Sequence, residues 1–198
     1  MVEKYGSVPV ILERHKDELS RYVFDAEADA GRLFLEAEQE YLDLAAGAPE
    51  TLAYLKAQGI ELSVVTAAKS GPGSAEESCE YRFLVKHDVL KYFDSVISPR
   101  GKLRVKDGSV DRRYEGTSKE DGTIYDAVAE ELATRGIPTD QALMMGDKEW
   151  TDIAPAKARG FKTILYTGYI CRGPTEADLV VERFSDVTRL VGGLQHGG

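Results

Sequence analysis

The segment Met145-Gly-Asp-Lys-Glu-Trp-Thr-Asp152 determines the fold that this sequence predicts. It begins at the end of a hydrophobic run, residues 142–145, which is typical of a buried strand. The segment carries two carboxylates, Asp147 and Asp152, on a loop that starts with glycine. Ligands collect at the carboxyl ends of strands in open α/β sheets, and Mg²⁺ prefers carboxylate oxygens. We therefore expect a Mg²⁺ site at Asp147 and Asp152; the alternative is that Asp147 caps a turn and Asp152 caps a helix.

Helices and strands alternate on both sides of this segment. The apolar spacing predicts helices at residues 49–58, 74–86, 89–93, 121–134, 152–160 and 187–191. Short apolar runs predict strands at residues 60–65, 95–98, 142–145, 161–166 and 179–181. This order predicts an α/β fold with a doubly wound, Rossmann-like, mostly parallel sheet and helices on both faces.

A β-hairpin insertion is predicted between the second and third of these αβ units. Residues 102–106 and 109–114 flank Asp107-Gly108. This dipeptide suits the positive φ angles of a tight primed turn. Alternating polar and apolar residues predict a half-exposed ribbon.

The length and composition suit one main domain. With 198 residues, of which 42% are hydrophobic, the chain can bury a sizeable core. We predict a strand and helical cap-like segment at residues 1–46, an α/β core at residues 47–191, and a flexible tail at residues 192–198.

The charge balance and the absence of long apolar runs exclude several classes of protein. A net charge of −9 argues against a sequence-independent nucleic-acid binder. No apolar run approaches the ~18 residues of a membrane span, and residues 1–10 lack the order of a signal peptide. We therefore expect a cytoplasmic protein with no membrane partner. The sequence leaves its oligomeric state open and allows a homodimer.

Polar residues lie at three of the connections between predicted strands and helices. Thr66 follows the strand at residues 60–65, Lys119 precedes the helix at residues 121–134, and Asp147 and Asp152 follow a third strand. A phosphate needs hydrogen-bond donors, a cation and a bridging metal, and these residue types supply them. The alternatives are that Thr66 caps the following turn and that Lys119 is a solvated side chain.

These motifs resemble those of the haloacid dehalogenase-like hydrolases. The resemblance rests on Val64-Val-Thr66, Lys119-Glu-Asp-Gly-Thr-Ile-Tyr125 and Met145-Gly-Asp-x-x-x-x-Asp152, and it covers residues 47–191. It implies that Thr66 binds phosphoryl oxygens, that Lys119 stabilises the nucleophile and the phosphate, that Asp147 ligates Mg²⁺, and that Asp152 ligates or orients it. Family members are mostly phosphatases that act on small phosphorylated metabolites through an aspartyl-phosphate.

The chain departs from the family at the first motif. No Asp-x-Asp-Gly-Thr sequence is present. Asp25, which follows the apolar residues 22–24 and precedes Glu27 by two positions, is one candidate for the catalytic nucleophile. Glu13 with His15, after the better strand at residues 8–12, is another. The third interpretation makes residues 17–46 helical, so that Asp25 is a solvated charge.

Two functions follow from these observations. The first is a Mg²⁺-dependent phosphatase with a small phosphorylated substrate, in which Asp25 and Lys119 are catalytic. The second is a non-catalytic relative that keeps the anion and metal site as a binding or scaffolding module. The four retained residues favour a working anion site, whereas the missing first motif favours the second function.

Overall fold

The computed structural model describes residues 42–67, 79–169 and 173–195. The chain divides into two compact units, Met1–Asp43 and Leu44–Gly198. All the elements described below lie in the second unit. The predicted strand and helices before residue 42, with the candidates Asp25, Glu13 and His15, fall outside the described residues.

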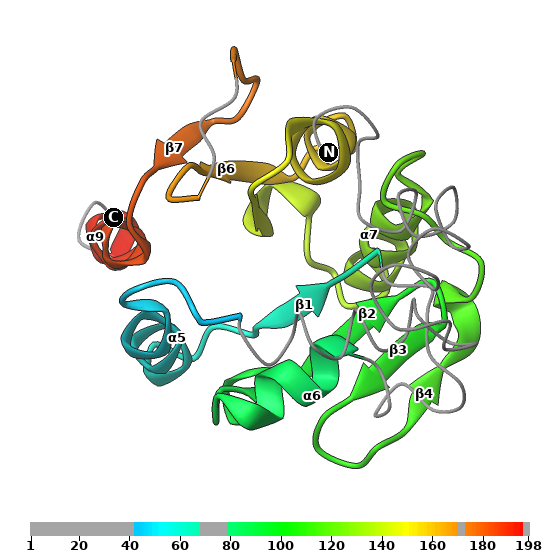
Figure 1. Ribbon diagram of the computed structural model, residues 1–198. Coiled ribbons are helices and arrows are strands. Elements are labelled where there is room, and N and C mark those ends of the chain that lie inside the picture. The colour runs from blue at the N-terminus through cyan, green and yellow to red at the C-terminus, as the bar shows by residue number, and fades with distance from the viewer. Residues whose placement is uncertain (1–41, 68–78, 170–172, 196–198) are drawn as a thin grey trace, which may run out of the picture. The chain divides into compact units, whose positions relative to one another are not determined.

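The second unit is an α/β structure, as predicted (Figure 1). Its α-helices are α5 (Ala48–Ala57), α6 (Cys79–Lys86), α7 (Thr123–Thr134), α8 (Ala154–Lys157) and α9 (Phe184–Gln195). Its strands are β1 (Ser63–Val65), β2 (Ser95–Ser98), β3 (Gly101–Arg104), β4 (Val110–Asp111), β5 (Leu143–Gly146), β6 (Lys162–Tyr166) and β7 (Leu179–Val181). Short 3-10 helices are η2 (Leu90–Tyr92), η3 (Arg112–Tyr114) and η4 (Thr139–Gln141), and η5 (Glu149–Ile153) is a π-helical turn. None of the described helices has the length and hydrophobicity that a membrane crossing requires.

The described strands form two sheets. One has the order β1-β2-β3-β4 and the other the order β5-β6-β7. Of the five pairings among them, three are parallel and two, on either side of β3, are antiparallel. β1 and β5 each have a single partner among the described strands. The parallel pairs confirm the predicted sheet type, and the crossovers from β1 to β2 and from β5 to β6 contain the helices α6 and α8.

Most predicted elements lie within a few residues of their expected positions. β2 and β7 match their predictions, and η2 confirms the short helix. The helix predicted at residues 152–160 is shorter, because the π-helical turn η5 takes up its first residues and α8 begins only at Ala154. α9 continues to Gln195, so the first residues of the segment predicted as a tail are helical.

The β3–β4 hairpin is confirmed, but its turn differs from the prediction. The register pairs Leu103 with Val110, and the connection is longer than a two-residue primed turn. Only Gly108 has a positive φ, +69°, while Asp107 accepts hydrogen bonds from the backbone N–H and the hydroxyl of Ser109. The ribbon is also less exposed than predicted, because the first three residues of β3 are buried.

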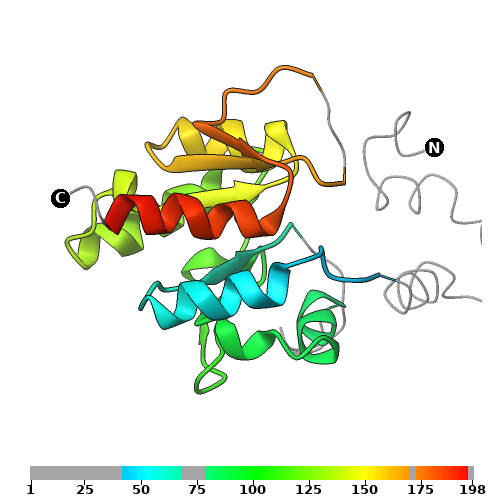
Figure 2. The ribbon, with the colours of Figure 1, turned by 90° about the vertical axis from the view of Figure 1, so that its left-hand side faces the viewer.

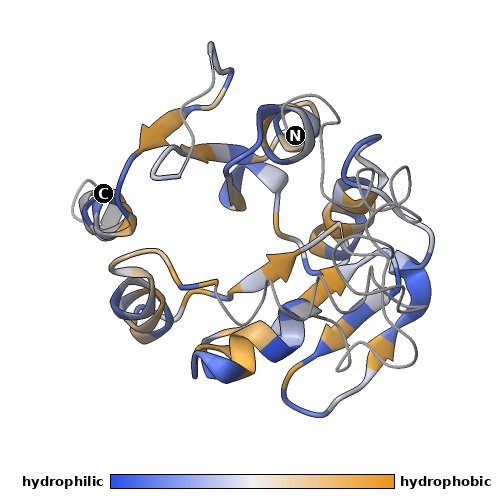
Figure 3. Ribbon diagram, in the orientation of Figure 1, coloured by the Kyte–Doolittle hydropathy of each residue, from blue (hydrophilic) through white to orange (hydrophobic). Residues whose placement is uncertain are grey.

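The core consists of clusters on the faces of the two sheets. Ile124 and Tyr125 of α7 pack with Ile97 of β2 and Phe161. The second cluster joins α9 to β6 and β7, and Leu55 of α5 packs against it. α5 and α9 accordingly lie side by side in both views (Figures 1 and 2). The strands β1, β2 and β7 are mainly hydrophobic (Figure 3), and β2 is buried along its whole length.

Candidate active site

Lys119 lies in the loop between η3 and α7 and is buried, with 8% of its surface exposed. Its ammonium donates a hydrogen bond to the carbonyl oxygen of Val65, at 3.2 Å, at the end of β1. The same Nζ lies 2.5 Å from Oδ1 of Asp152. The prediction that Lys119 belongs to a site at the strand ends is thus consistent with its contacts, and the alternative of a solvated side chain is wrong.

Asp152 is the most buried polar group of the site, with 3% of its surface exposed. Beyond Lys119, its Oδ1 accepts from the Thr151 hydroxyl at 3.2 Å, and its Oδ2 accepts from the Lys148 backbone N–H at 3.1 Å. Such bonds and an opposite charge compensate a buried carboxylate for the hydration that it loses. Asp152 lies inside η5 and does not cap α8, so that alternative is also wrong.

Gly146, the last residue of β5, is required by the position of the Asp152 side chain. A Cβ at Gly146 would overlap with the Cβ, Cγ and Oδ2 of Asp152. Glycine is therefore required here because a side chain would not fit, and not because of a positive φ angle. It lets the carboxylate lie directly against the end of the strand.

Thr66 and Asp147 follow the ends of β1 and β5. The backbone N–H of Thr66 donates to the carbonyl of Ile97 at 2.9 Å, which extends the pairing of β1 with β2 by one residue. Thr66 is half-buried and Asp147 is exposed. Asp147 makes no hydrogen bond or ion pair with any residue that the structure describes. The side-chain contacts thus bring Lys119 and Asp152 together at the end of β1, while the roles of Thr66 and Asp147 stay predictions.

Tyr125 of α7 supports the Asp152 loop from inside the core. Its hydroxyl donates to the carbonyl of Thr151 at 2.7 Å, and its ring packs against Phe161. Burial raises the pKa of Tyr125, and the charge of Asp152 raises it further. The phenol therefore stays a proton donor at all physiological pH values and holds the η5 backbone in place.

Glu149 and Trp150 are the first two residues of η5, and their surroundings differ. The carboxylate of Glu149 accepts from the Thr175 hydroxyl at 2.5 Å and from the Glu176 backbone N–H at 3.1 Å. Both oxygens are therefore engaged in tying the loop before β7 to η5. Trp150 is 50% exposed and is not packed beneath the loop.

The carboxylates of the site meet the needs of Mg²⁺. Among the described residues, no three His, Cys, Asp or Glu side chains gather in a metal-binding cluster. Mg²⁺ needs only one or two carboxylates, because it keeps several water ligands. The exposed carboxylate of Asp147 fits direct ligation, and Asp152, whose oxygens are engaged, fits a role in orienting it.

A family model described as haloacid dehalogenase-like hydrolase matches residues 8–160. A search of curated proteins gave no match. The chain is similar in fold to a HAD phosphatase from Thermococcus onnurineus, with a TM-score of 0.61, 23% identity, and coverage of 97% of this chain and 85% of that chain. It is also similar to the magnesium-bound putative HAD-hydrolase YfnB from Bacillus subtilis, with a TM-score of 0.65, 16% identity, and coverage of 96% and 81%.

A dehalogenase has a similar fold as well. The 2-haloacid dehalogenase from Pseudomonas syringae matches with a TM-score of 0.58 and 17% identity, covering 93% of this chain and 72% of that chain. At these identities the solved structures show the fold alone. They do not distinguish hydrolysis of a phosphate ester from hydrolysis of a carbon–halogen bond.

Proposed function

Since the chain belongs to the haloacid dehalogenase-like hydrolases, we propose that it is a Mg²⁺-dependent phosphatase acting on a small phosphorylated metabolite. The observation that carries this proposal is the buried pair of Lys119 and Asp152 at the end of β1. A buried ammonium that reaches a strand-end carbonyl is a preorganised positive charge. Such charges stabilise the oxyanions of a phosphoryl group far more than they would in water.

Each proposed residue supplies one element of phosphate recognition. Lys119 offsets the negative charge of the phosphoryl oxygens, and the Thr66 hydroxyl donates a hydrogen bond to one of them. Asp147 would hold the metal, and Asp152 orients the ammonium and would orient the ligands of the metal. When bound, Mg²⁺ supplies the remaining positive charge next to the phosphate.

The nucleophile is proposed from the sequence alone, because its candidates lie outside the described residues. Asp25 is our first choice, and Glu13 is the alternative. A carboxylate that attacks phosphorus forms an acyl-phosphate and releases the alcohol, and water then releases inorganic phosphate. If Asp25 is the nucleophile, Asp25→Asn should abolish turnover and Glu13→Gln should leave turnover unchanged. If Glu13 is the nucleophile, Glu13→Gln should abolish turnover and Asp25→Asn should leave it unchanged.

The proposal is tested with p-nitrophenyl phosphate in the presence of Mg²⁺ or of a chelator. We expect phosphate release that needs Mg²⁺ and that falls at least about a hundredfold in Asp147→Asn. The matched control is Asp140→Asn, because Asp140 is an exposed aspartate in η4. If the protein releases chloride from 2-chloropropionate and releases no phosphate, it is a dehalogenase and the phosphatase proposal is wrong.

A non-catalytic anion-binding protein is the second candidate. It is favoured by the absence of an Asp-x-Asp-Gly-Thr sequence anywhere in the chain. This candidate predicts that inorganic phosphate with Mg²⁺ raises the melting temperature of the protein without any turnover. Saturable hydrolysis that depends on Asp147 would exclude it.

A further inference from the structure

Arg159, at the end of the α8 segment, joins the two loops that carry the site. Its guanidinium makes a bidentate ion pair with Asp126 in the first turn of α7, with Nε at 2.7 Å and Nη2 at 2.8 Å from the two oxygens. Nη2 also donates to the carbonyl of Asp121 at 3.1 Å, and Nη1 donates to the carbonyl of Pro155 at 3.0 Å. One side chain therefore binds both the loop of Lys119 and the segment of Asp152.

The guanidinium also covers Gly122, the N-cap residue of α7. Gly122 is buried and has a φ of +81°, and a Cβ there would overlap with the guanidinium of Arg159. No side chain caps α7 at this residue. Arg159 thus occupies the space that a side chain at position 122 would fill, and its planar fork suits two carbonyls and a carboxylate at once.

We propose that Arg159 is a positioning residue, which holds the 119–122 loop against the η5–α8 segment so that the Lys119 ammonium stays on Asp152. Its relevance to catalysis rests on the proposed function, whereas the positioning itself does not. Arg159 touches neither Lys119 nor Asp152, so it acts through the loop backbone. Two of its acceptors are the uncharged carbonyl groups of Asp121 and Pro155. The three nitrogens of the guanidinium reach these two carbonyls and the carboxylate of Asp126 together.

A second link between the same segments defines what Arg159 adds. The buried hydroxyl of Tyr125 bonds to the carbonyl of Thr151, so α7 and η5 stay attached when Arg159 is removed. Tyr125 lies within the helix, however, and the backbone of Ser118 is bonded to Thr123 and Ile124 of that same helix. Arg159 adds a bond from the η5–α8 segment to the Asp121 carbonyl in the loop. Loss of Arg159 should therefore loosen the Lys119 loop and leave the fold intact.

Lys102 is an internal reference for measuring this effect. Lys102 is 7% exposed and lies 2.5 Å from Glu131, while Lys119 is 8% exposed and lies 2.5 Å from Asp152. Both amines are therefore shielded to the same degree. The rate of reductive methylation of each lysine, measured by peptide mass spectrometry on the full-length apo protein, reports how often it becomes exposed.

In Arg159→Ala we expect methylation of Lys119 to rise about tenfold, with Lys102 unchanged. Arg135→Ala is the matched control, because it removes another arginine that pairs bidentately with a carboxylate, Glu61, and should change neither rate. Unchanged rates in Arg159→Ala, or equal rises at Lys119 and Lys102, would overturn the proposal. If Arg159→Ala does not fold, Arg159→Gln is judged by the same criteria.

The same variants separate this proposal from the proposed function. A selective rise at Lys119 in a protein that hydrolyses no phosphate ester would support the positioning role and refute the phosphatase. If the protein hydrolyses phosphate esters and Arg159→Ala leaves the methylation rate of Lys119 unchanged, the phosphatase is supported and the positioning role is refuted.

Discussion

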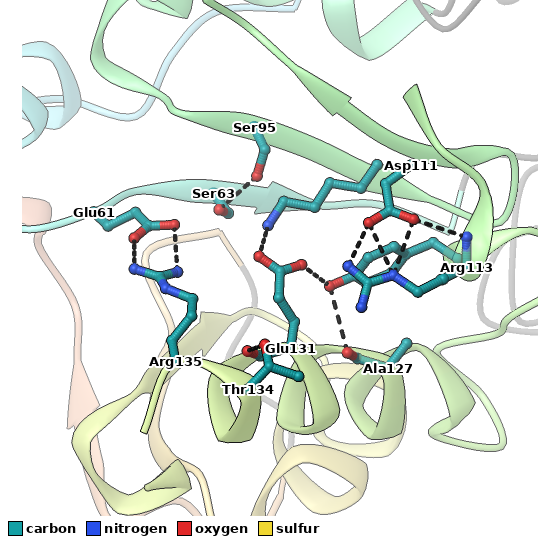
Figure 4. A network of polar contacts seen from close by, with 11 residues as sticks. Glu61, Ser63, Ser95, Asp111, Arg113, Ala127, Glu131, Thr134 and Arg135 are labelled. Carbon is teal, nitrogen blue, oxygen red and sulfur yellow. Dashed lines mark hydrogen bonds and ion pairs between the residues drawn. The ribbon is translucent and has the colours of Figure 1, made fainter. Parts of the chain in front are cut away.

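Glu131 of α7 is held between two buried donors, and replacing it with glutamine should be costly. Its Oε1 lies 2.5 Å from the ammonium of Lys102, and its Oε2 accepts from the Tyr114 hydroxyl at 2.6 Å (Figure 4). The side chains of Lys102 and Glu131 are only 9% and 16% exposed. Glu131→Gln keeps the volume and leaves the ammonium buried without a counter-charge.

The burial of the pair sets the magnitude. Removing one partner of a buried ion pair costs about 3–5 kcal/mol, and the slight exposure of Glu131 places the loss near the lower limit, about 3 kcal/mol. Glu61→Gln is the control, since Glu61 and Arg135 are also 2.5 Å apart but are 45% and 41% exposed. An exposed pair of this kind contributes less than about 1 kcal/mol.

Urea unfolding at neutral pH measures both variants. With a slope near about 2 kcal/mol/M, the midpoint for Glu131→Gln should fall by roughly 1.5 M and that for Glu61→Gln by less than roughly 0.5 M. The double variant Lys102→Met, Glu131→Met should recover at least half of the loss, because it leaves no unpaired charge. Equal losses in the two single variants would show that burial does not govern the strength of these pairs.

Two further predictions concern a glycine and a carboxylate. In thermal unfolding, Gly122→Ala should destabilise the protein by about 2–3 kcal/mol, because alanine would take a left-handed backbone conformation and displace Arg159. In the same assay Gly136→Ala, at a φ of +70° with open space, should cost only about 1 kcal/mol. Hydrogen bonds from Lys157, and then from Thr163, lower the pKa of Asp178 from 3.8 to about 2. A carboxyl group whose pKa is lower in the folded than in the unfolded protein stabilises the fold at pH values above its unfolded pKa. The difference in unfolding free energy between wild type and Asp178→Asn should therefore shrink as the pH falls below 3.8. A difference that grows with acid would contradict this.

The sequence predicted the elements well where hydrophobic spacing alone determines them. α7 follows from Ile124, Val128 and Leu132 at helical spacing, and β2 from a four-residue run between turn residues. The hairpin turn was predicted less well, because Leu103 is buried and pairs with Val110, and a dipeptide cannot reveal this longer connection.

The site was predicted in its residue types but not in its contacts. Spacing placed Lys119 and Asp152 at strand ends, but it could not show that they pair with each other or that Glu149 is engaged by the loop at 175–176. Arg159 was missed because Asp126 and Asp121 precede it by 33 and 38 residues, and no local pattern marks an arginine that binds backbone carbonyls. A π-helical turn is equally invisible, since its extra residue does not alter the apolar pattern.

The absence of a side chain at Gly146 constrains how this protein can diverge. The carboxyl group of Asp152 occupies the volume where any larger residue at position 146 would place its first carbon. A descendant that acquires alanine or serine at position 146 must therefore lose or relocate the acid six residues later, and Lys119 would then face no anion. The two positions should change together in related sequences or not change at all.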